Sequence, residues 1–173
     1  KVGDELKTSA LQAILIALGL VLIYITFRFQ WRQGIAAIIT LLHDVMVVVG
    51  IFSIFDKEFT LPVIAALLTV VGYSLNDTIV IFDRIRENIS KFRKRELLPL
   101  INQSVTETLS RTLLTSGTTL MVVLALVFLG GEIIHDFAFA LLVGVLIGTY
   151  SSIYVASPTV LWLTKIAPPK TSD

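Results

Sequence analysis

The sequence contains no cysteine, and only two of its 173 residues are histidine. It therefore offers no disulfide framework, no thiol nucleophile and no thiolate metal site. Charged residues are also scarce, at 16%, whereas hydrophobic residues reach 55% and the mean hydropathy is +0.85. A soluble domain of this size could not bury that much apolar surface, so we expect the chain to lie in a lipid bilayer.

Other absences narrow the class of protein. The sequence has no alternating strand pattern, nucleophile–base set, phosphate-binding loop or metal-ligand cluster. This predicts an all-α protein that is not an enzyme and holds no cofactor or metal. The net charge of +1 comes without a basic stripe, so nucleic acid is not an expected partner. The chain begins at Lys1 rather than at methionine, and we interpret it as part of a longer protein.

Five apolar stretches have about the 20 residues that a bilayer crossing needs. They lie near residues 10–27, 34–55, 61–82, 104–129 and 137–164. The sequence therefore predicts a polytopic membrane helical bundle, with residues 1–173 as a single transmembrane domain. An odd number of spans places the two ends of the chain on opposite sides of the membrane.

The basic residues predict which side is which. Eleven of the lysines and arginines fall on one side, most of them in a loop at residues 84–103, and three fall on the other. The positive-inside rule then predicts a cytoplasmic loop and carboxy terminus, with the amino terminus of this chain in the periplasm. Membrane lipid, through anionic headgroups, is the expected contact of the basic loop, with protein docking as the alternative.

A helix start is also predicted at the end of this loop. Ser104 followed by Glu107 has the form of a capping box, in which each side chain bonds to the backbone of the other. We expect a cytoplasmic elbow helix that leads from there into the fourth span.

Polar residues inside the spans are the candidate functional residues, because a charge in hydrocarbon is costly unless it is paired or used. Asp77 lies six residues before Asp83 at the inner end of the third span, and Arg111 lies seven residues after Ser104 on the fourth. At 1.5 Å per residue, both are roughly 10 Å from the same side. Arginine keeps its charge under all accessible conditions, so Asp77 is the member that can exchange a proton. The sequence thus predicts a proton relay of Asp77 and Arg111.

Neighbouring polar residues are expected to support this pair. Thr108, Arg111, Thr115 and Thr118 recur at spacings of three and four, which predicts one polar stripe on the fourth span. The alternative is a static ion pair that holds two helices together, with Glu107 as the partner of Arg111 at i, i+4. The predicted supporting residues are Ser74, Asn76, Thr115, Thr118 and Thr119.

Two His-Asp dipeptides have open interpretations. His43 and Asp44 lie near the middle of the second span, where histidine favours a relay and the divergent directions of adjacent helical residues favour simple packing. His135 and Asp136, with Glu132, precede the fifth span and are interpreted as a solvated turn.

Small residues recur at every fourth position of the fifth span. They are Ala140, Gly144, Gly148, Ser152 and Ala156. Such a ridge allows another membrane helix to approach closely, so we predict a close helix contact along it. Pro158 follows the ridge and is expected to kink or loosen the last turns.

Three long segments resemble the SecF family, which belongs to the resistance-nodulation-division superfamily of transporters. They are residues 71–88, which include Ser-Leu-Asn-Asp, residues 109–119, which include Ser-Arg-Thr-Leu, and residues 148–157. The resemblance implies six transmembrane helices with a periplasmic domain between the first and second. The first helix and that domain are expected to lie outside this chain. In the family, the aspartate of Ser-Leu-Asn-Asp and the arginine of Ser-Arg-Thr-Leu are tied to proton conduction, and they match Asp77 and Arg111.

The resemblance also implies a cellular role. SecF family members use the proton-motive force to help secreted precursor proteins through the SecYEG channel of the bacterial cytoplasmic (inner) membrane. The implied partner is SecD, whose own aspartate is thought to complete the proton path, with YajC and YidC as further candidates. A proton-coupled small-molecule exporter and a purely structural helical subunit are the alternative functions.

Overall fold

The computed structural model describes residues 2–92 and 96–166, and nearly all of them are helical. In lipid a backbone must satisfy its own hydrogen bonds, and long apolar segments therefore become helices. The helices are α1 (Val2–Arg28), α2 (Trp31–Ile54), α3 (Leu61–Lys91), α4 (Leu97–Leu129), α5 (Glu132–Ser151), the π-helix η1 (Ser152–Ala156) and α6 (Ser157–Ile166).

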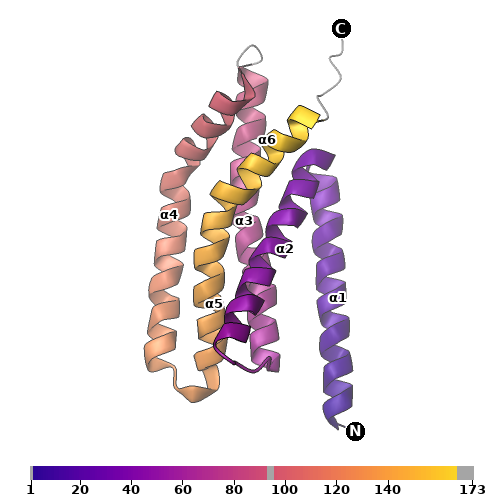
Figure 1. Cartoon of the computed structure of the whole chain (residues 1–173), viewed down its shortest axis with the longest axis vertical. Helices are drawn as coiled ribbons and strands as arrows, with labels where there is room; N and C mark the ends of the chain where they lie inside the picture. The colour runs from indigo at the N-terminus through magenta and orange to yellow at the C-terminus, as the bar shows by residue number, and fades with distance from the viewer. Residues whose placement is uncertain (1, 93–95, 167–173) are drawn as a thin grey trace.

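The helices form one elongated bundle (Figure 1). α1 and α4 lie at opposite edges, with α2, α3 and α5 between them, and α1 begins at the end opposite to where α6 stops. α2, α3, α4 and the continuous segment Glu132–Ile166 are each long and apolar enough to cross a membrane. The apolar part of α1, Leu15–Arg28, is shorter. The predicted helical membrane bundle is confirmed.

The predicted loop at residues 84–103 is wrong. α3 continues to Lys91 and α4 begins at Leu97, so the connection is much shorter than the charge pattern suggested. The apolar character ends before the helices do, because polar contacts between α3 and α4 continue the hairpin. One of them joins Asn88 Nδ2 to Ser104 Oγ at 2.9 Å.

The predicted capping box is wrong for the same reason. Ser104 lies inside α4, where its hydroxyl donates to the Leu100 carbonyl at 2.7 Å. The Glu107 carboxylate accepts hydrogen bonds from α3 and from Gln103 instead of capping a helix start. The expected elbow helix is therefore the first part of α4 itself, which runs obliquely in Figure 1 before the helix straightens.

Apolar side chains form two separate core clusters. One, at the end of the bundle where α3 meets α4, includes Phe29, Phe82, Ile85 and Ile101. The other, near the opposite end, is built from Val48, Phe52, Val63, Ala66 and Ala140. Along α2, α3 and α5, buried polar residues lie between these clusters. Along the bundle, a layer of buried polar residues therefore separates the two apolar clusters.

The ridge of small residues on α5 and η1 packs against α3. All five residues of the ridge are buried. A Cβ atom at Gly144 would overlap the Val70 side chain, and one at Gly148 would lie 3.0 Å from Ser74 Cβ. One turn later, Ser152 Oγ lies 3.2 Å from Thr78 Oγ1. The α3 partners recur at every fourth residue, as the ridge does, so the two parallel helices stay in register.

The helix loosens just before Pro158, as the sequence predicts. Residues 152–156 form the π-helix η1, and α6 starts at Ser157. Proline at 158 cannot donate a hydrogen bond to the carbonyl four residues earlier, and a π-helical turn absorbs this defect. α6 consequently runs at an angle to α5 (Figure 1).

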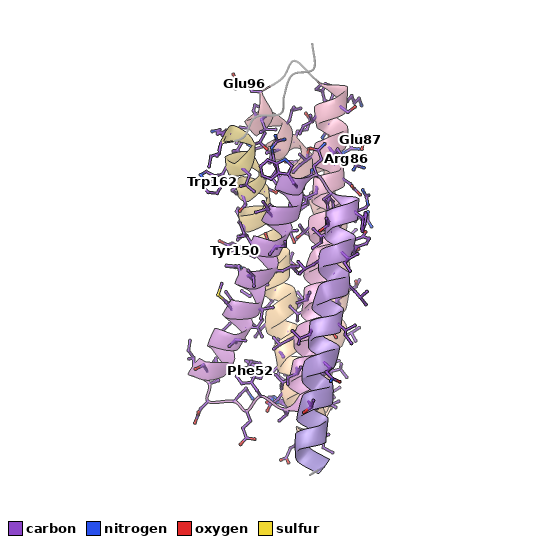
Figure 2. The ribbon with its side chains drawn as sticks, turned by 90° about the vertical axis from the view of Figure 1, so that its right-hand side faces the viewer. Phe52, Arg86, Glu87, Glu96, Tyr150 and Trp162 are labelled. Atoms are coloured by element: carbon purple, nitrogen blue, oxygen red, sulfur yellow. The ribbon has the colours of Figure 1, made fainter. Side chains whose placement is uncertain are left out.

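Charged residues gather at the ends of the bundle. Figure 2 shows Arg86, Glu87 and Glu96 at one end and Phe52 near the other. At the latter end, Lys57 Nζ lies 2.5 Å from Asp136 Oδ1, which joins the α2–α3 turn to the start of α5.

Candidate functional site

The candidate site is the polar layer between the two apolar clusters. Its nine residues are each at most 3% exposed: Thr40, Asp44, Ser74, Asp77, Thr78, Thr112, Ser116, Ser151 and Ser152. A hydroxyl buried without a hydrogen-bond partner costs roughly 1–3 kcal/mol. Several of these hydroxyls avoid this cost by donating to backbone carbonyls of their own helices. The two carboxylates need a different explanation, because burial of a charge is far more costly.

Asp77 lies on the α3 face that meets α4 and α5. Ser116 Oγ on α4 donates to Asp77 Oδ2 at 3.5 Å, a long hydrogen bond. The same hydroxyl accepts from Tyr73 OH at 3.3 Å and lies 2.7 Å from Thr149 Oγ1 on α5. Ser116 therefore links α3, α4 and α5 beside the Asp77 carboxyl.

Arg111 is exposed on α4 and, among the described residues, forms no ion pair. It nevertheless attracts the Asp77 carboxylate electrostatically. The contacts Arg84–Glu107 and Asp77–Ser116 bracket its position, so Arg111 lies about one helical turn nearer the α3–α4 connection than Asp77 does. The structure thus brings the predicted pair close without direct contact.

Glu107 is not the partner of Arg111. The Glu107 carboxylate oxygen Oε2 accepts hydrogen bonds from Arg84 Nε at 2.6 Å and from Asn88 Nδ2 at 3.0 Å. Both donors belong to α3. The alternative in which Glu107 pairs with Arg111 along α4 is therefore wrong. The carboxylate bridges two helices because α3 extends past the apolar segment and presents its own arginine.

A substitution at Glu107 tests this assignment. Glu107→Gln should loosen the hairpin end, because a neutral amide holds Arg84 less strongly than a carboxylate does. We expect faster amide hydrogen exchange in residues 97–107 and unchanged exchange in residues 112–129. An increase centred on Arg111 would contradict the assignment. Glu87→Gln is the matched control, since Glu87 pairs with Arg84 only within α3, at 2.6 Å.

The predicted supporting residues do not surround Asp77. Asn76, Thr115 and Thr118 are exposed, and Thr119 is half-buried. The three threonines donate to carbonyls of their own helix at about 3.0 Å. The predicted stripe of α4 does not face α3 as a whole, because Thr108 is buried whereas Arg111, Thr115 and Thr118 are exposed. The face that meets α3 carries Ser104, Thr108, Thr112 and Ser116, each four residues apart.

Ser74 is buried, but it bonds to Asp44 rather than to the predicted pair. Its hydroxyl donates to Asp44 Oδ2 at 2.5 Å, while His43 Nδ1 lies 3.1 Å from Asp44 Oδ1. Sequence reasoning left Asp44 between relay and packing, and it missed Ser116. The even spacing of four from Ser104 to Ser116 was the available signal for Ser116. No one-dimensional pattern pairs Asp44 with Ser74.

Comparisons with known proteins agree on one family. Residues 1–166 match the family described as protein export membrane protein SecD/SecF, C-terminal. The protein translocase subunit SecF of Desulfurispirillum indicum is 57% identical over 160 residues, which cover 91% of this chain and 51% of that protein. SecF of Vibrio alginolyticus is 56% identical over 162 residues, 94% of this chain and 51% of that protein.

Longer proteins match as well. The protein translocase subunit SecDF of Thermus thermophilus is 52% identical over 160 residues, 92% of this chain and 22% of that protein. A crystal structure of SecDF in its super-membrane-facing form is 51% identical, with a TM-score of 0.86 over 94% of this chain and 22% of that one. The chain spans about half the length of these SecF relatives. The chain belongs to the SecD/SecF family of protein export membrane proteins, as a SecF-type member.

Proposed function

We propose that this chain is the proton-responsive membrane part of a SecF subunit, which works with SecD to drive precursor proteins across the bacterial cytoplasmic membrane. The observation that carries the proposal is the buried Asp77 carboxyl, held by Ser116 and attracted by the nearby charge of Arg111. Arginine stays charged, so a proton on Asp77 changes the attraction between α3 and α4.

The helix contacts supply a route from this charge change to movement. Asp77 takes up a proton from the periplasmic side, and the attraction to Arg111 is lost. Ser116 then remains bonded to Thr149, so the change reaches α5 as well as α4. Moving one charge through 100 mV provides about 2.3 kcal/mol, so a few protons per cycle suffice to shift a two-state bundle.

The partner is expected on the outer face of α4. α4 buries only 17% of its apolar stretch inside the bundle, compared with 39–44% for the other spans. That face also carries the exposed Arg111. We propose that SecD covers it and that the SecD aspartate which the family resemblance implies for the proton path is the acidic partner of Arg111. SecYEG, YajC and YidC would be further partners of the whole complex, with the α3–α4 connection and the carboxy terminus in the cytoplasm.

Asp77→Asn in the full complex tests the proposal. Proton uptake and precursor export are measured together in membrane vesicles with an imposed proton gradient. Loss of a positioned proton-transfer group typically slows transfer by 10²–10⁴-fold, so we expect the gradient-dependent part of export to fall by roughly 100-fold or more.

Asp83→Asn is the matched control, because Asp83 is on the same helix but outside the polar layer, where it pairs with Arg28. It should leave proton uptake nearly unchanged. Full gradient-dependent export by Asp77→Asn, in a complex that assembles normally, would rule out the relay.

A further inference from the structure

Asp44 is the most enclosed carboxyl of the polar layer. It is 0% exposed and lies on α2, facing α3, and α2, α3 and α5 are neighbours in the bundle (Figure 1). Its contact with Ser74 places it at a level three residues from Asp77 along α3, or about 4.5 Å deeper in the span. Asp44 is therefore a second intramembrane acid, distinct from the one that the proposed function uses.

No lysine or arginine pairs with Asp44 in the described part of the chain. Among the described residues, the titratable group that contacts it is His43, at 3.1 Å. An ionised carboxylate beside a neutral imidazole would be a net charge buried in hydrocarbon, which is strongly unfavourable. The pair is neutral only when it holds one proton more than a neutral ring and a carboxylate do, either as imidazolium with carboxylate or as neutral imidazole with carboxylic acid.

Other charges in the neighbouring helices do not change this balance. Asp77, the other carboxyl of the layer, is one turn further along α3 and is acidic itself. α5 and η1 carry no ionisable side chain between Asp136 and Ala156 other than two exposed tyrosines. Of the remaining ionisable groups of these helices, Tyr73 bonds to Ser116, Arg28 pairs with Asp83 and Arg84 pairs with Glu107. The others belong to the end of the bundle where α3 meets α4 (Figure 1), far along the helices from Asp44: Arg32, Arg86, Glu87, Lys91 and Lys165.

The second His-Asp dipeptide of the chain provides a direct comparison. His135 Nδ1 lies 3.3 Å from Asp136 Oδ1, nearly the geometry of His43 and Asp44. However, the Asp136 side chain is 39% exposed and pairs with Lys57. Lys57 therefore balances the charge of Asp136. Asp44 is buried and has no such partner among the described residues, which sets the two dipeptides apart.

His43 links the Asp44 carboxyl to the outer face of α2 near the middle of the span. Its side chain is 35% exposed, whereas the Asp44 side chain lies inside the bundle. Protonated His43 can pass its Nδ1 proton to Asp44 Oδ1, which leaves a neutral ring and a carboxylic acid. Ser74 suits both forms, because a hydroxyl can donate to the carboxylate or accept from the acid.

We propose that Asp44 is a second proton-binding site of the bundle and that His43, on the outer face of α2, loads it by transfer of its Nδ1 proton. Its part in coupling rests on the proposed function, whereas proton binding by Asp44 does not. Close contact of Ser74 with Gly148 holds the hydroxyl in place, since even a methyl group on residue 148 would crowd it. A change of protonation at Asp44 therefore acts on the contact between α2 and α3 and, through Ser74, on α5.

Infrared difference spectroscopy of the full SecD–SecF complex in vesicles tests this proposal. Stepping the pH should produce a carboxylic-acid carbonyl band that Asp44→Asn removes and Asp77→Asn retains. Asp136→Asn is the control and should leave the band unchanged. The exchange of this acid proton for deuterium should slow by roughly 100-fold in His43→Gln, because a positioned proton carrier is lost.

The possible results separate the two proposals. Identical spectra of the wild type and Asp44→Asn would overturn the second site, even if Asp77→Asn abolishes export. A band that survives in Asp77→Asn, in a complex that still couples export to the gradient, would overturn the proposed function and leave the second site standing. If Asp44→Asn fails to assemble, His43→Gln decides, and an unchanged exchange rate there overturns the loading step.

Discussion

Replacing Gly144 with alanine should destabilise the bundle by about 1–3 kcal/mol, although alanine favours helix by about 1 kcal/mol over glycine. The added Cβ would overlap the Val70 side chain, to which Gly144 packs directly. In a membrane, helices gain stability from close packing rather than from the hydrophobic effect, so separating α3 from α5 loses the main contact along the ridge. Reversible unfolding of the protein in bicelles measures the change.

Two further variants isolate the cause. Val70→Ala alone should also destabilise, because it leaves a void in a close-packed contact. Combined with Gly144→Ala, it provides room for the new methyl group, and the pair should show a favourable coupling energy of about 0.5–3 kcal/mol. Gly50→Ala is the matched control, since no atom lies within 4 Å of a Cβ there and the substitution should be neutral or stabilising. Strictly additive effects of the pair would mean that overlap with Val70 is not the reason.

The ridge shows what the sequence can predict in a membrane protein. Hydropathy locates the spans because a long apolar segment in lipid must form a helix to satisfy its backbone hydrogen bonds. A spacing of four residues then identifies one face of that helix. Hydropathy and spacing are both properties of a single segment. The partner of the ridge could not be predicted, because the contacting residues of α3 do not form a pattern of small residues like that of the ridge. They are Val70, Ser74 and Thr78.

The orientation of the α4 stripe could not be predicted for one physical reason. A stripe can be read from spacing only when the rotation of the helix is known, and that rotation is set by tertiary packing. Thr112 and Ser116 face α3, whereas Arg111 and Thr115 lie on the exposed side of α4. Depth along the span, which depends only on the rise per residue, placed Asp77 and Arg111 within about one turn of each other.

Asp44 illustrates a different limit. Adjacent helical positions point about 100° apart, and on that ground His43 and Asp44 could not face one partner. The structure agrees, because only Asp44 reaches Ser74, yet the two side chains still contact each other at 3.1 Å. A rule about backbone direction does not account for the reach of side chains toward a neighbour.

Arg111→Met should weaken the association of SecF with SecD by about 2–5 kcal/mol, the usual cost of removing one member of a buried, hydrogen-bonded charge pair. Arg111 is exposed in this chain and forms no ion pair with a described residue, so the proposed SecD acid would be its partner and would be left unpaired. Energy transfer between labelled SecD and SecF in vesicles measures the association. Thr115→Val, one turn away on the same exposed side of α4, is the control and should change it little.

A compensating substitution then separates assembly from proton coupling. Neutralising the SecD acid to its amide in the Arg111→Met background removes the unpaired charge, so association should recover to within about tenfold of the wild type. Gradient-dependent export should be absent in both variants, because the fixed charge that attracts the Asp77 carboxylate is gone and, in the double variant, the SecD acid of the proton path is gone as well. If export returns together with association, Arg111 only holds the two subunits together, and the proton acts without it. If neither returns, the partner of Arg111 is a different group, and the exposed face of α4 meets SecD in another register.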